Sequence, residues 1–553
     1  MKKIVLVLSL VGVLSACNKF LDMTPRDSIS DKVMWSNTES AEYAVNSIYS
    51  YAYDIYASWP STVGMTESFT DMFKYGSYVN FAFCLIPSQV AYGGTNLTNS
   101  FVDVYLGAWT PLYKAIKNTN EAIFYLKELG TGLPEADKTR LQAELRLMRG
   151  WLYFELMKRY KEVIIYDEDL SKIAVEKELS SEAEGWDFVW KDLEFAKDNL
   201  PEKAAARGRL NKDMALALIT RSMLYAKEYQ RVIDAADALS ATYSLMPSYA
   251  DAFTKSVTEG NTETILQYSF SYSDGLTHEF DFYYAPGGDY KLVGQQGGGY
   301  GTPTQEMVES YEKADGSGFP DWSPWHGSTG TVAEPPYEQL EPRFQATILY
   351  NGATWKGRKI EPFVGGTDGW CQWNKDAQPE GRTTTGYYLR KFVDESHDLT
   401  VRSESTQHFV LLRYGEVLLN KAEACYRNND FPGANAAVKE IRNRVGLPYT
   451  DKSGDALWAA IRQERRVELA FEDLWYWDLR RWGDAGKDYP VGLNNYQVHG
   501  LKIETTSVEG QYQYTYVSVD DKDRNFPSKM YRFPIPDSEL NSNPLVNQYP
   551  EWN

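Results

Sequence analysis

Two helical segments joined by a three-residue turn constrain the fold of this chain most strongly. Residues 408–427 carry apolar or small side chains at helical spacing, and residues 434–445 repeat this pattern after the turn at 428–430. The second segment ends at Gly446 with Pro448 beyond it, which is a typical helix stop. Because so short a connection leaves neighbouring helices antiparallel, the sequence predicts a helical hairpin.

The same periodicity appears earlier in the chain, in residues 141–160 and 211–227. The first of these segments has one apolar face, formed by Leu141, Leu145, Met148, Leu152 and Leu156. Alanines recur in the later segments and allow neighbouring helices to approach closely. Antiparallel helix pairs of this kind resemble tetratricopeptide units. The sequence therefore predicts a mainly α-helical fold, built on a tetratricopeptide-like scaffold of helix pairs.

The helical pattern fades between about residues 250 and 401. Glycine, proline and aromatic residues dominate there, as in residues 283–288 and 297–301. Residues 58–105 and 483–553 are also irregular. Since long irregular segments of a compact protein usually carry function, we expect the scaffold to support long, aromatic-rich loops.

The N-terminus has the pattern of a lipoprotein signal peptide. A basic start precedes residues 4–14, an apolar stretch too short to span a bilayer. It leads into Leu14-Ser15-Ala16-Cys17, with the cysteine where the cleavage rule requires it. We predict that residues 1–16 are removed and that Cys17 carries a lipid anchor. The alternative is an ordinary signal peptide followed by an accidental cysteine.

The net charge of the chain limits its possible partners, and its cysteine content limits the disulfide bonds that it can form. The 553 residues have a formal net charge of -19, which makes nucleic acid an unfavourable partner. Of the four cysteines, Cys17 is assigned to the lipid, and three others make no disulfide framework. Cys425 lies in a helical pattern and is expected to be a buried thiol. Whether Cys84 and Cys371 pair is left open.

The sequence contains no familiar catalytic or metal-binding motif. There is no G-x-S-x-G, H-E-x-x-H or phosphate-binding glycine loop, and the five histidines lack metal-ligand spacing. Glu464, Glu468 and Glu472 lie four apart on a predicted helix, residues 461–482. A glycosidase needs carboxylates on opposite sides of a cleft, so we interpret them as structural partners of nearby arginines. We therefore predict no enzyme activity, cofactor or metal site. These arginines are Arg462, Arg465, Arg466, Arg480 and Arg481.

Aromatic residues in the loops are the candidate ligand-binding groups. The chain has 16 Trp and 40 Tyr; those in the predicted helices are explained by core packing, and those in the loops are the informative ones. A sugar ring has an apolar C–H face that stacks on an aromatic ring, and rigid rings lose little entropy on binding. The alternative for each ring is that it fixes its loop to the core. The candidates are Tyr283, Tyr284, Tyr290, Tyr300, Trp322, Trp325, Trp370 and Trp373.

Several segments, in order along the whole chain, resemble the SusD/RagB family of outer-membrane nutrient-binding lipoproteins. The most recognisable is Leu412-Arg413-Tyr414-Gly415-Glu416-Val417-Leu418-Leu419-Asn420-Lys421-Ala422-Glu423-Ala424. The others are residues 17–25, 143–154, 208–211, 303–306, 341–343, 464–482, 534–536 and 543–545.

The resemblance implies a helical tetratricopeptide scaffold with an irregular ligand-binding face. It also implies a protein at the exterior of the outer membrane that captures oligosaccharide or polysaccharide and passes it to a SusC-like TonB-dependent barrel. The family has no shared catalytic residues, and its binding residues vary. By position we add Tyr92 and Asn96 to the candidates. The expected parts are residues 17–250, a ligand-binding region at 251–401, and a C-terminal part at 402–553.

Three alternatives remain beside glycan binding. The same apparatus could take peptides or another nutrient. A surface glycosidase would show two loop carboxylates roughly 5–10 Å apart across a cleft. An adaptor with only protein partners would show an apolar concave groove.

Overall fold

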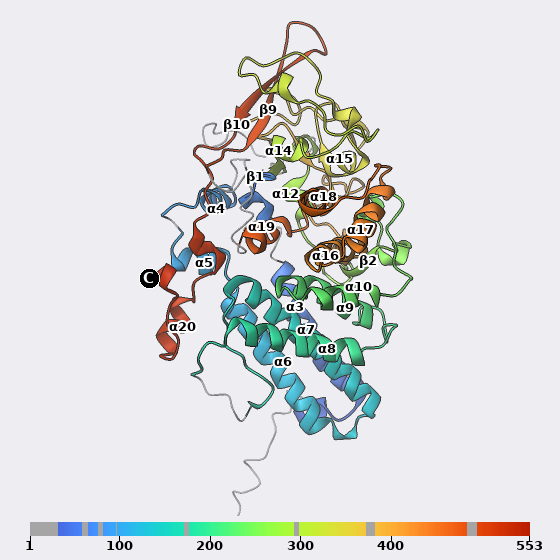
Figure 1. The fold of residues 1–553 in the computed structure, drawn as a ribbon, viewed down its shortest axis with the longest axis vertical. Helices are drawn as coiled ribbons and strands as arrows, with labels where there is room; N and C mark the ends of the chain where they lie inside the picture. Colours follow the sequence, from blue (N-terminus) through green and yellow to red (C-terminus); the bar gives the residue numbers. More distant parts are fainter. Residues whose placement is uncertain are drawn as a thin grey trace, which may run out of the picture.

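The computed structural model describes residues 31–57, 65–75, 81–95, 97–170, 176–291, 298–371, 382–483 and 495–553. Helices fill one half of the molecule, and loops with short strands fill the other (Figure 1). In the described part of the chain, no helix combines the length and apolar character needed to cross a membrane.

Helices of the N-terminal half form what we call the helical array (Figure 1). From α6 to α10 each helix packs against the next, and α3 packs against both α6 and α7. The predicted apolar face of residues 141–160 is confirmed, since its five side chains are at most 2% exposed. The bounds are α3 Thr38–Ala57, α6 Trp109–Leu129, α7 Glu135–Tyr160, α8 Glu182–Asn199, α9 Lys212–Tyr225 and α10 Tyr229–Asp237.

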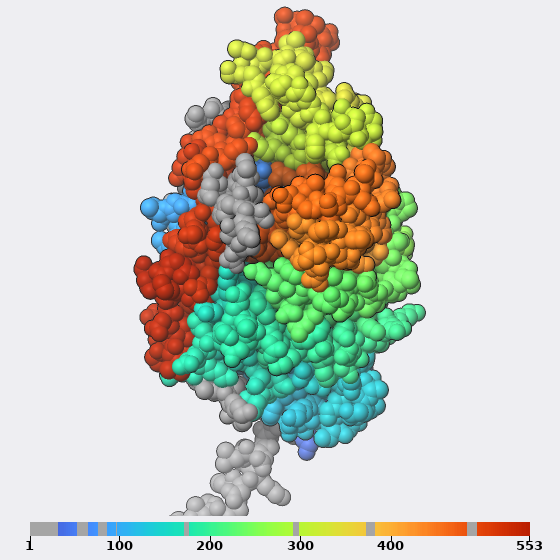
Figure 2. All heavy atoms as spheres, in the orientation of Figure 1, coloured from blue at the N-terminus to red at the C-terminus, as the bar shows by residue number. Residues whose placement is uncertain are grey.

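The predicted helical hairpin is confirmed and extends this array from a distant part of the sequence. It consists of α16 (Tyr414–Arg427) and α17 (Phe431–Arg444), and α16 packs against α9 and α10. Asp430 caps α17 by accepting a hydrogen bond from the backbone N–H of Gly433 at 3.0 Å. In Figure 2 these helices (orange) lie directly on the array (green). The scaffold therefore combines segments from both ends of the chain.

Two sequence-based boundaries are wrong. Residues 409–413, predicted as helix, form strand β8 (Phe409–Arg413), which pairs antiparallel with β2 (Thr264–Tyr268). Short apolar runs fit either structure, and the partner strand decides between them. The predicted helix 461–482 is two helices, α18 (Gly454–Glu468) and α19 (Trp475–Gly483). They are separated because Phe471 and Asp473 have φ values of 62° and 59°, which a helix cannot contain.

The loop-rich half contains short antiparallel strand pairs. Besides β2–β8, they are β1 Phe73–Tyr75 with β3 Gly301–Pro303, β4 Ile348–Leu349 with β7 Tyr388–Leu389, β5 Thr354–Trp355 with β6 Arg358–Lys359, and β9 His499–Thr505 with β10 Tyr512–Ser518. The β9–β10 hairpin, at the top of Figure 1, lies in a region predicted to be irregular. The short helices are α2 Asp31–Met34, α4 Phe81–Tyr92, α5 Asn99–Tyr105, α11 Asp251–Thr254, α12 Phe280–Tyr284, α13 Gly288–Lys291, α14 Gln305–Val308, α15 Pro342–Thr347 and α20 Asp537–Ser542.

The C-terminal tail returns to the helical array. The backbone N–H of Phe533 donates to the carbonyl of Arg159 at 2.9 Å, and the Tyr549 hydroxyl donates to the carbonyl of Tyr160 at 3.1 Å. The predicted division at residues 250 and 401 stays a prediction, although β2 and β8 pair across the second of these positions. Cys425 is a fully buried free thiol, as predicted.

A buried network of charges surrounds α18. Glu468 pairs with Arg413 at 2.7 Å and with Arg343 at 3.2 Å, and it also contacts Arg444. Glu464 pairs with Arg343 at 2.7 Å. The structural role predicted for these glutamates is confirmed, but their partners are not the arginines of the same segment. They come from strands and helices elsewhere, which sequence spacing does not indicate. Removing one member of such a buried pair typically costs about 3–5 kcal/mol.

Candidate functional site

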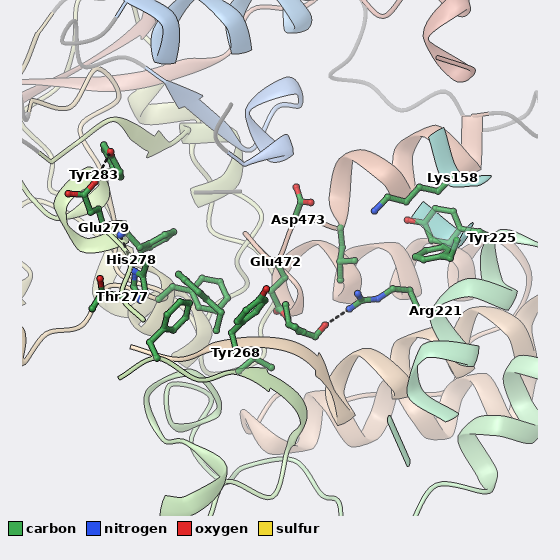
Figure 3. A pocket seen from close by; sticks show the side chains of 18 residues that line it. Lys158, Arg221, Tyr225, Tyr268, Thr277, His278, Glu279, Tyr283, Glu472 and Asp473 are labelled. Carbon is green, nitrogen blue, oxygen red and sulfur yellow. Dashed lines mark hydrogen bonds between the residues drawn. The ribbon is translucent and has the colours of Figure 1, made fainter. Parts of the chain in front are cut away.

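The candidate site is a cavity of about 300 Å³ between the helical array and the loop-rich half (Figure 3). Figure 3 shows residues of α7 and α9 on one side and residues 277–283 on the other, with β2 and the turn 472–474 between them. The cavity volume is at the lower end of the range of about 300–1,000 Å³ that small-molecule sites occupy.

One wall of the cavity is a cluster of aromatic rings. Tyr268 and Phe270 stack at 5.7 Å with an angle of 18° between their planes. Phe270 also contacts Phe409 at 5.8 Å, and Phe409 contacts Phe280 at 5.3 Å. Tyr268 ends β2 and Phe270 follows it, while Phe409 belongs to β8 and Phe280 to α12, so pairing of the two strands helps to bring these rings together. The wall offers flat apolar faces to a ligand.

His278 forms part of the same wall in its neutral state. Its Nδ1 lies 3.1 Å from the backbone N–H of Phe280, and its Nε2 lies 2.8 Å from the carbonyl of Gln407. An acceptor at Nδ1 and a donor at Nε2 define one neutral tautomer. Burial lowers the pKa of His278, which favours that state.

The two cations of the cavity already have partners. Arg221 donates to both carboxylate oxygens of Glu416, at 2.7 and 2.6 Å. Lys158 pairs with Glu155 at 2.8 Å and lies 4.5 Å from the ring of Trp477. Burial lowers the pKa of Lys158 to about 8, although Glu155 opposes the shift. Both side chains are therefore held by the protein itself.

Two carboxylates of the cavity, those of Glu279 and Asp473, are held by hydrogen bonds from neutral groups. Glu279 accepts a hydrogen bond from the Tyr283 hydroxyl at 3.1 Å. Asp473 accepts from the backbone N–H and the hydroxyl of Thr66, at 3.1 and 2.5 Å. Within the described residues, neither carboxylate forms an ion pair with lysine or arginine. Each retains acceptor capacity for hydroxyl groups of a ligand.

Behind Asp473 lies a buried acid, Glu67, which is 0% exposed. Its Oε1 accepts from the backbone N–H of Leu474 at 3.3 Å, and its Oε2 has no hydrogen-bond partner among the residues that the structure describes. Burial, and then the charge of Asp473, raise the pKa of Glu67 to about 8. Glu67 is therefore mainly neutral at pH 7.

Of the described residues predicted from sequence, Tyr283 lines this cavity, where it packs against Tyr300 at 5.0 Å. Tyr300 is buried, as are Tyr284, whose hydroxyl contacts that of Tyr75, and Tyr290.

The remaining predicted residues lie elsewhere. Trp322 and Trp325 are buried against each other, with ring centroids 5.6 Å apart. Trp370 is half-buried, and Tyr92 is buried beside Asp520. Cys17, Asn96, Trp373 and the side chain of Cys84 lie outside the described residues. A ligand-binding role for the eight described candidates stays a prediction.

Sequence reasoning missed most of the cavity. Its rings at 268, 270, 280 and 409 were not singled out, because strand pairing and not sequence proximity assembles them. One available signal was the alternation of aromatic and polar residues from Gln267 to Ser273. Within the described residues, no group of three or more His, Cys, Asp or Glu side chains is arranged to hold a metal ion.

Comparisons with known proteins cover the whole chain. The model of a family described as "SusD family" matches residues 262–552. A second model, described as "Starch-binding associating with outer membrane", matches residues 19–224. A SusD-like protein of Bacteroides ovatus is 25% identical over 592 residues, covering 100% of this chain and 98% of the relative.

Two solved structures from Bacteroides fragilis have the same fold. One is a SusD-like protein with 25% identity and a TM-score of 0.73, covering 96% of this chain and 100% of its own. The other is a SusD-like carbohydrate-binding protein with 23% identity and a TM-score of 0.73, covering 93% of this chain and 100% of its own.

Proposed function

This chain belongs to the SusD family, and we propose that it is an outer-membrane lipoprotein that binds oligosaccharide or polysaccharide in the cavity described above. It does no chemistry on the glycan and delivers it to a SusC-like TonB-dependent barrel. The starch-binding description of the family model that matches residues 19–224 supports a carbohydrate ligand.

The observation that carries this proposal is the combination of groups in the cavity. Tyr268 and Phe270 offer ring faces to the C–H faces of a sugar. Glu279 and Asp473 offer carboxylate oxygens to its hydroxyls. A glycan can make both kinds of contact at once, whereas a purely apolar ligand would leave the remaining acceptor capacity of Glu279 and Asp473 unused.

The charges of the cavity favour an uncharged glycan. Lys158 and Arg221 are engaged by Glu155 and Glu416, so they offer little to an anion. The carboxylates without a cation partner would repel a uronate or sulfate group. We therefore expect neutral oligosaccharides to bind more tightly than acidic ones of the same length.

Calorimetric titration of the mature protein, carrying Cys17→Ser to prevent lipidation, against plant, algal and microbial glycans tests the proposal. Phe270→Ala should lower affinity for the glycan that binds by tenfold or more. Phe319→Ala is the matched control, because Phe319 is 50% exposed and lies outside the cavity. Equal affinity of both variants would show that the binding site lies outside the cavity.

Location and partner need separate experiments. Cys17→Ser in the full precursor should release the protein from the outer membrane, and exposure to protease added to intact cells should identify the side it faces.

The barrel partner is tested by solubilising outer membranes in mild detergent and identifying what co-purifies with the chain. Recovery without any TonB-dependent barrel would contradict the delivery step.

Two alternative functions predict different results with the same protein preparation. Peptide binding predicts heat of binding with peptide mixtures and none across the glycan panel. A glycosidase using Glu279 and Asp473 predicts new reducing ends, lost in Glu279→Gln. We expect no new reducing ends from the wild-type protein.

A further inference from the structure

A strict alternation of polar and aromatic side chains runs through one segment of the cavity wall. The sequence is Gln267-Tyr268-Ser269-Phe270-Ser271-Tyr272-Ser273. In extended backbone, alternate residues face the same side, which agrees with the stacking of Tyr268 on Phe270 at 5.7 Å. Tyr268 and Phe270 line the cavity, and Tyr272 follows at the same spacing. Tyr272 opens the turn at residues 272–275, which follows the extended segment directly.

The outer end of this row is a fixed, exposed ring. Tyr272 is 45% exposed, and its hydroxyl donates to the carbonyl of Glu404 at 2.8 Å. The guanidinium of Arg402 lies over the ring, 4.1 Å from its centroid. Backbone hydrogen bonds of 2.8 and 3.0 Å between Ser271 and Leu276 close the hairpin that carries Tyr272. The ring is thus held in place without being buried.

Single exposed apolar side chains are ordinary, but Tyr272 is not isolated. Leu276 on the same hairpin is 58% exposed, and Val401, next to Arg402, is 70% exposed. The hairpin also connects two walls of the cavity, because Phe270 precedes it and Thr277 follows it. Tyr272 and Leu276 therefore lie on a hairpin whose two flanking residues both line the cavity.

Two of the polar residues of the alternation line a second cavity, of about 510 Å³. Gln267 and Ser269 line it together with Thr406 and Gln407, and Phe270 lines both cavities. Amide and hydroxyl groups are suited to hydrogen bonding with sugar hydroxyls. Aromatic faces and polar groups thus occur side by side along one segment.

We propose that Tyr268, Phe270 and Tyr272 form a single binding track for a glycan chain, on which successive sugar units extend from the cavity over the hairpin at residues 271–276. The proposal rests on the proposed function and makes it more specific. The ligand is an extended chain, longer than the cavity alone can hold, and not a monosaccharide or disaccharide.

The experiment compares short and long members of the same glycan series. The probes are the disaccharide and a longer oligosaccharide of α-glucan, β-glucan, mannan and galactan, titrated against the mature protein with Cys17→Ser. Tyr272→Ala should lower affinity for the longer member about three- to tenfold and leave disaccharide affinity unchanged. Tyr272→Phe keeps the ring and should stay close to wild type. Tyr43→Ala is the control, since Tyr43 is 64% exposed on α3, away from the cavity.

The outcomes separate this inference from the proposed function. Tighter wild-type binding of the longer member, lost in Tyr272→Ala but kept in Tyr43→Ala, supports the track. Equal wild-type affinity for short and long members, or unchanged affinity in Tyr272→Ala, overturns the track and leaves glycan binding intact. No wild-type binding to any series overturns the proposed function itself. Thermal unfolding of each variant checks that the fold is retained.

Discussion

The carboxylate of Glu423 on α16 accepts hydrogen bonds from both terminal nitrogens of Arg481 on α19, at 2.5 and 2.6 Å. Burial alone would raise the pKa of Glu423, but the positive charge of Arg481 outweighs it and lowers the pKa to about 2. The pair ties α19 to the helical hairpin. It also makes the stability of the protein sensitive to acid.

Glu423→Gln should lower the free energy of unfolding by about 3 kcal/mol at pH 7, because it removes one member of a buried pair. Since the folded pKa is below the ordinary value of 4.5, the contribution is full above pH 4.5 and is lost as pH falls toward 2. Urea denaturation between pH 3 and pH 7 measures both effects. Glu121→Gln, in an exposed pair with Lys117, should change stability by less than about 0.5 kcal/mol. An equal loss in both variants would contradict the prediction.

Glu67→Gln should have the opposite pH dependence. The folded pKa of Glu67, about 8, is raised above the ordinary value, so the wild type loses stability as pH rises from 4.5 to 8. Glutamine cannot ionise, and the variant should exceed the wild type by about 2 kcal/mol or more at pH 9 while matching it near pH 5. Denaturation at the two pH values measures the difference. A constant difference between the proteins would show that Glu67 does not titrate as described.

Glu279→Gln should weaken glycan binding about tenfold, because a hydrogen bond to a charged acceptor is worth roughly 1.5–3 kcal/mol. The fold should be unaffected, since Glu279 is exposed and, within the described residues, its side chain takes part in one hydrogen bond, donated by Tyr283. Calorimetry with the glycan found in the binding panel provides the measurement, with Glu121→Gln as the control. Wild-type affinity in Glu279→Gln would show that this carboxylate does not contribute to glycan binding.

Trp322→Ala tests whether a sequence-predicted binding residue is in fact a core residue. Trp322 is 5% exposed and packs against Trp325, so the truncation should lower the free energy of unfolding by about 3–5 kcal/mol. Glycan affinity, measured below the unfolding transition, should remain at the wild-type value. Trp322→Phe should be milder, because the indole N–H has no hydrogen-bond partner within the described part of the chain. Lost affinity with unchanged stability would restore Trp322 to the binding site.

Helix pairs could be predicted from the sequence because their signals are local. Spacing of three and four residues, and the turn that ends at Asp430, need no information from other parts of the chain. The break at Phe471 and Asp473 could not be predicted in this way. Contacts with distant residues such as Thr66 hold that turn, and helical spacing continues through it.

The site was harder to predict than the scaffold. Aromatic content identifies rings but not their direction, and Trp322 and Tyr283 look alike in sequence although one is buried and the other lines the cavity. Lys158 and Arg221 reach the cavity from helices that were interpreted only as scaffold. Pairing of β2 with β8 brings these parts together. Because the two strands are far apart in the sequence, local sequence patterns do not predict this pairing.

The packing of α16 on α9 and α10 also bears on how the protein acquires its structure. During synthesis α9 and α10 precede α16, with the entire loop-rich middle of the chain between them. Their apolar surface stays uncovered until that middle segment has been made. The scaffold is therefore completed late, by contacts between residues that are far apart in the sequence. Loop closure of this kind slows folding and leaves intermediates prone to aggregation. A fragment that stops before α16 should therefore be poorly soluble, even though it contains the whole helical array.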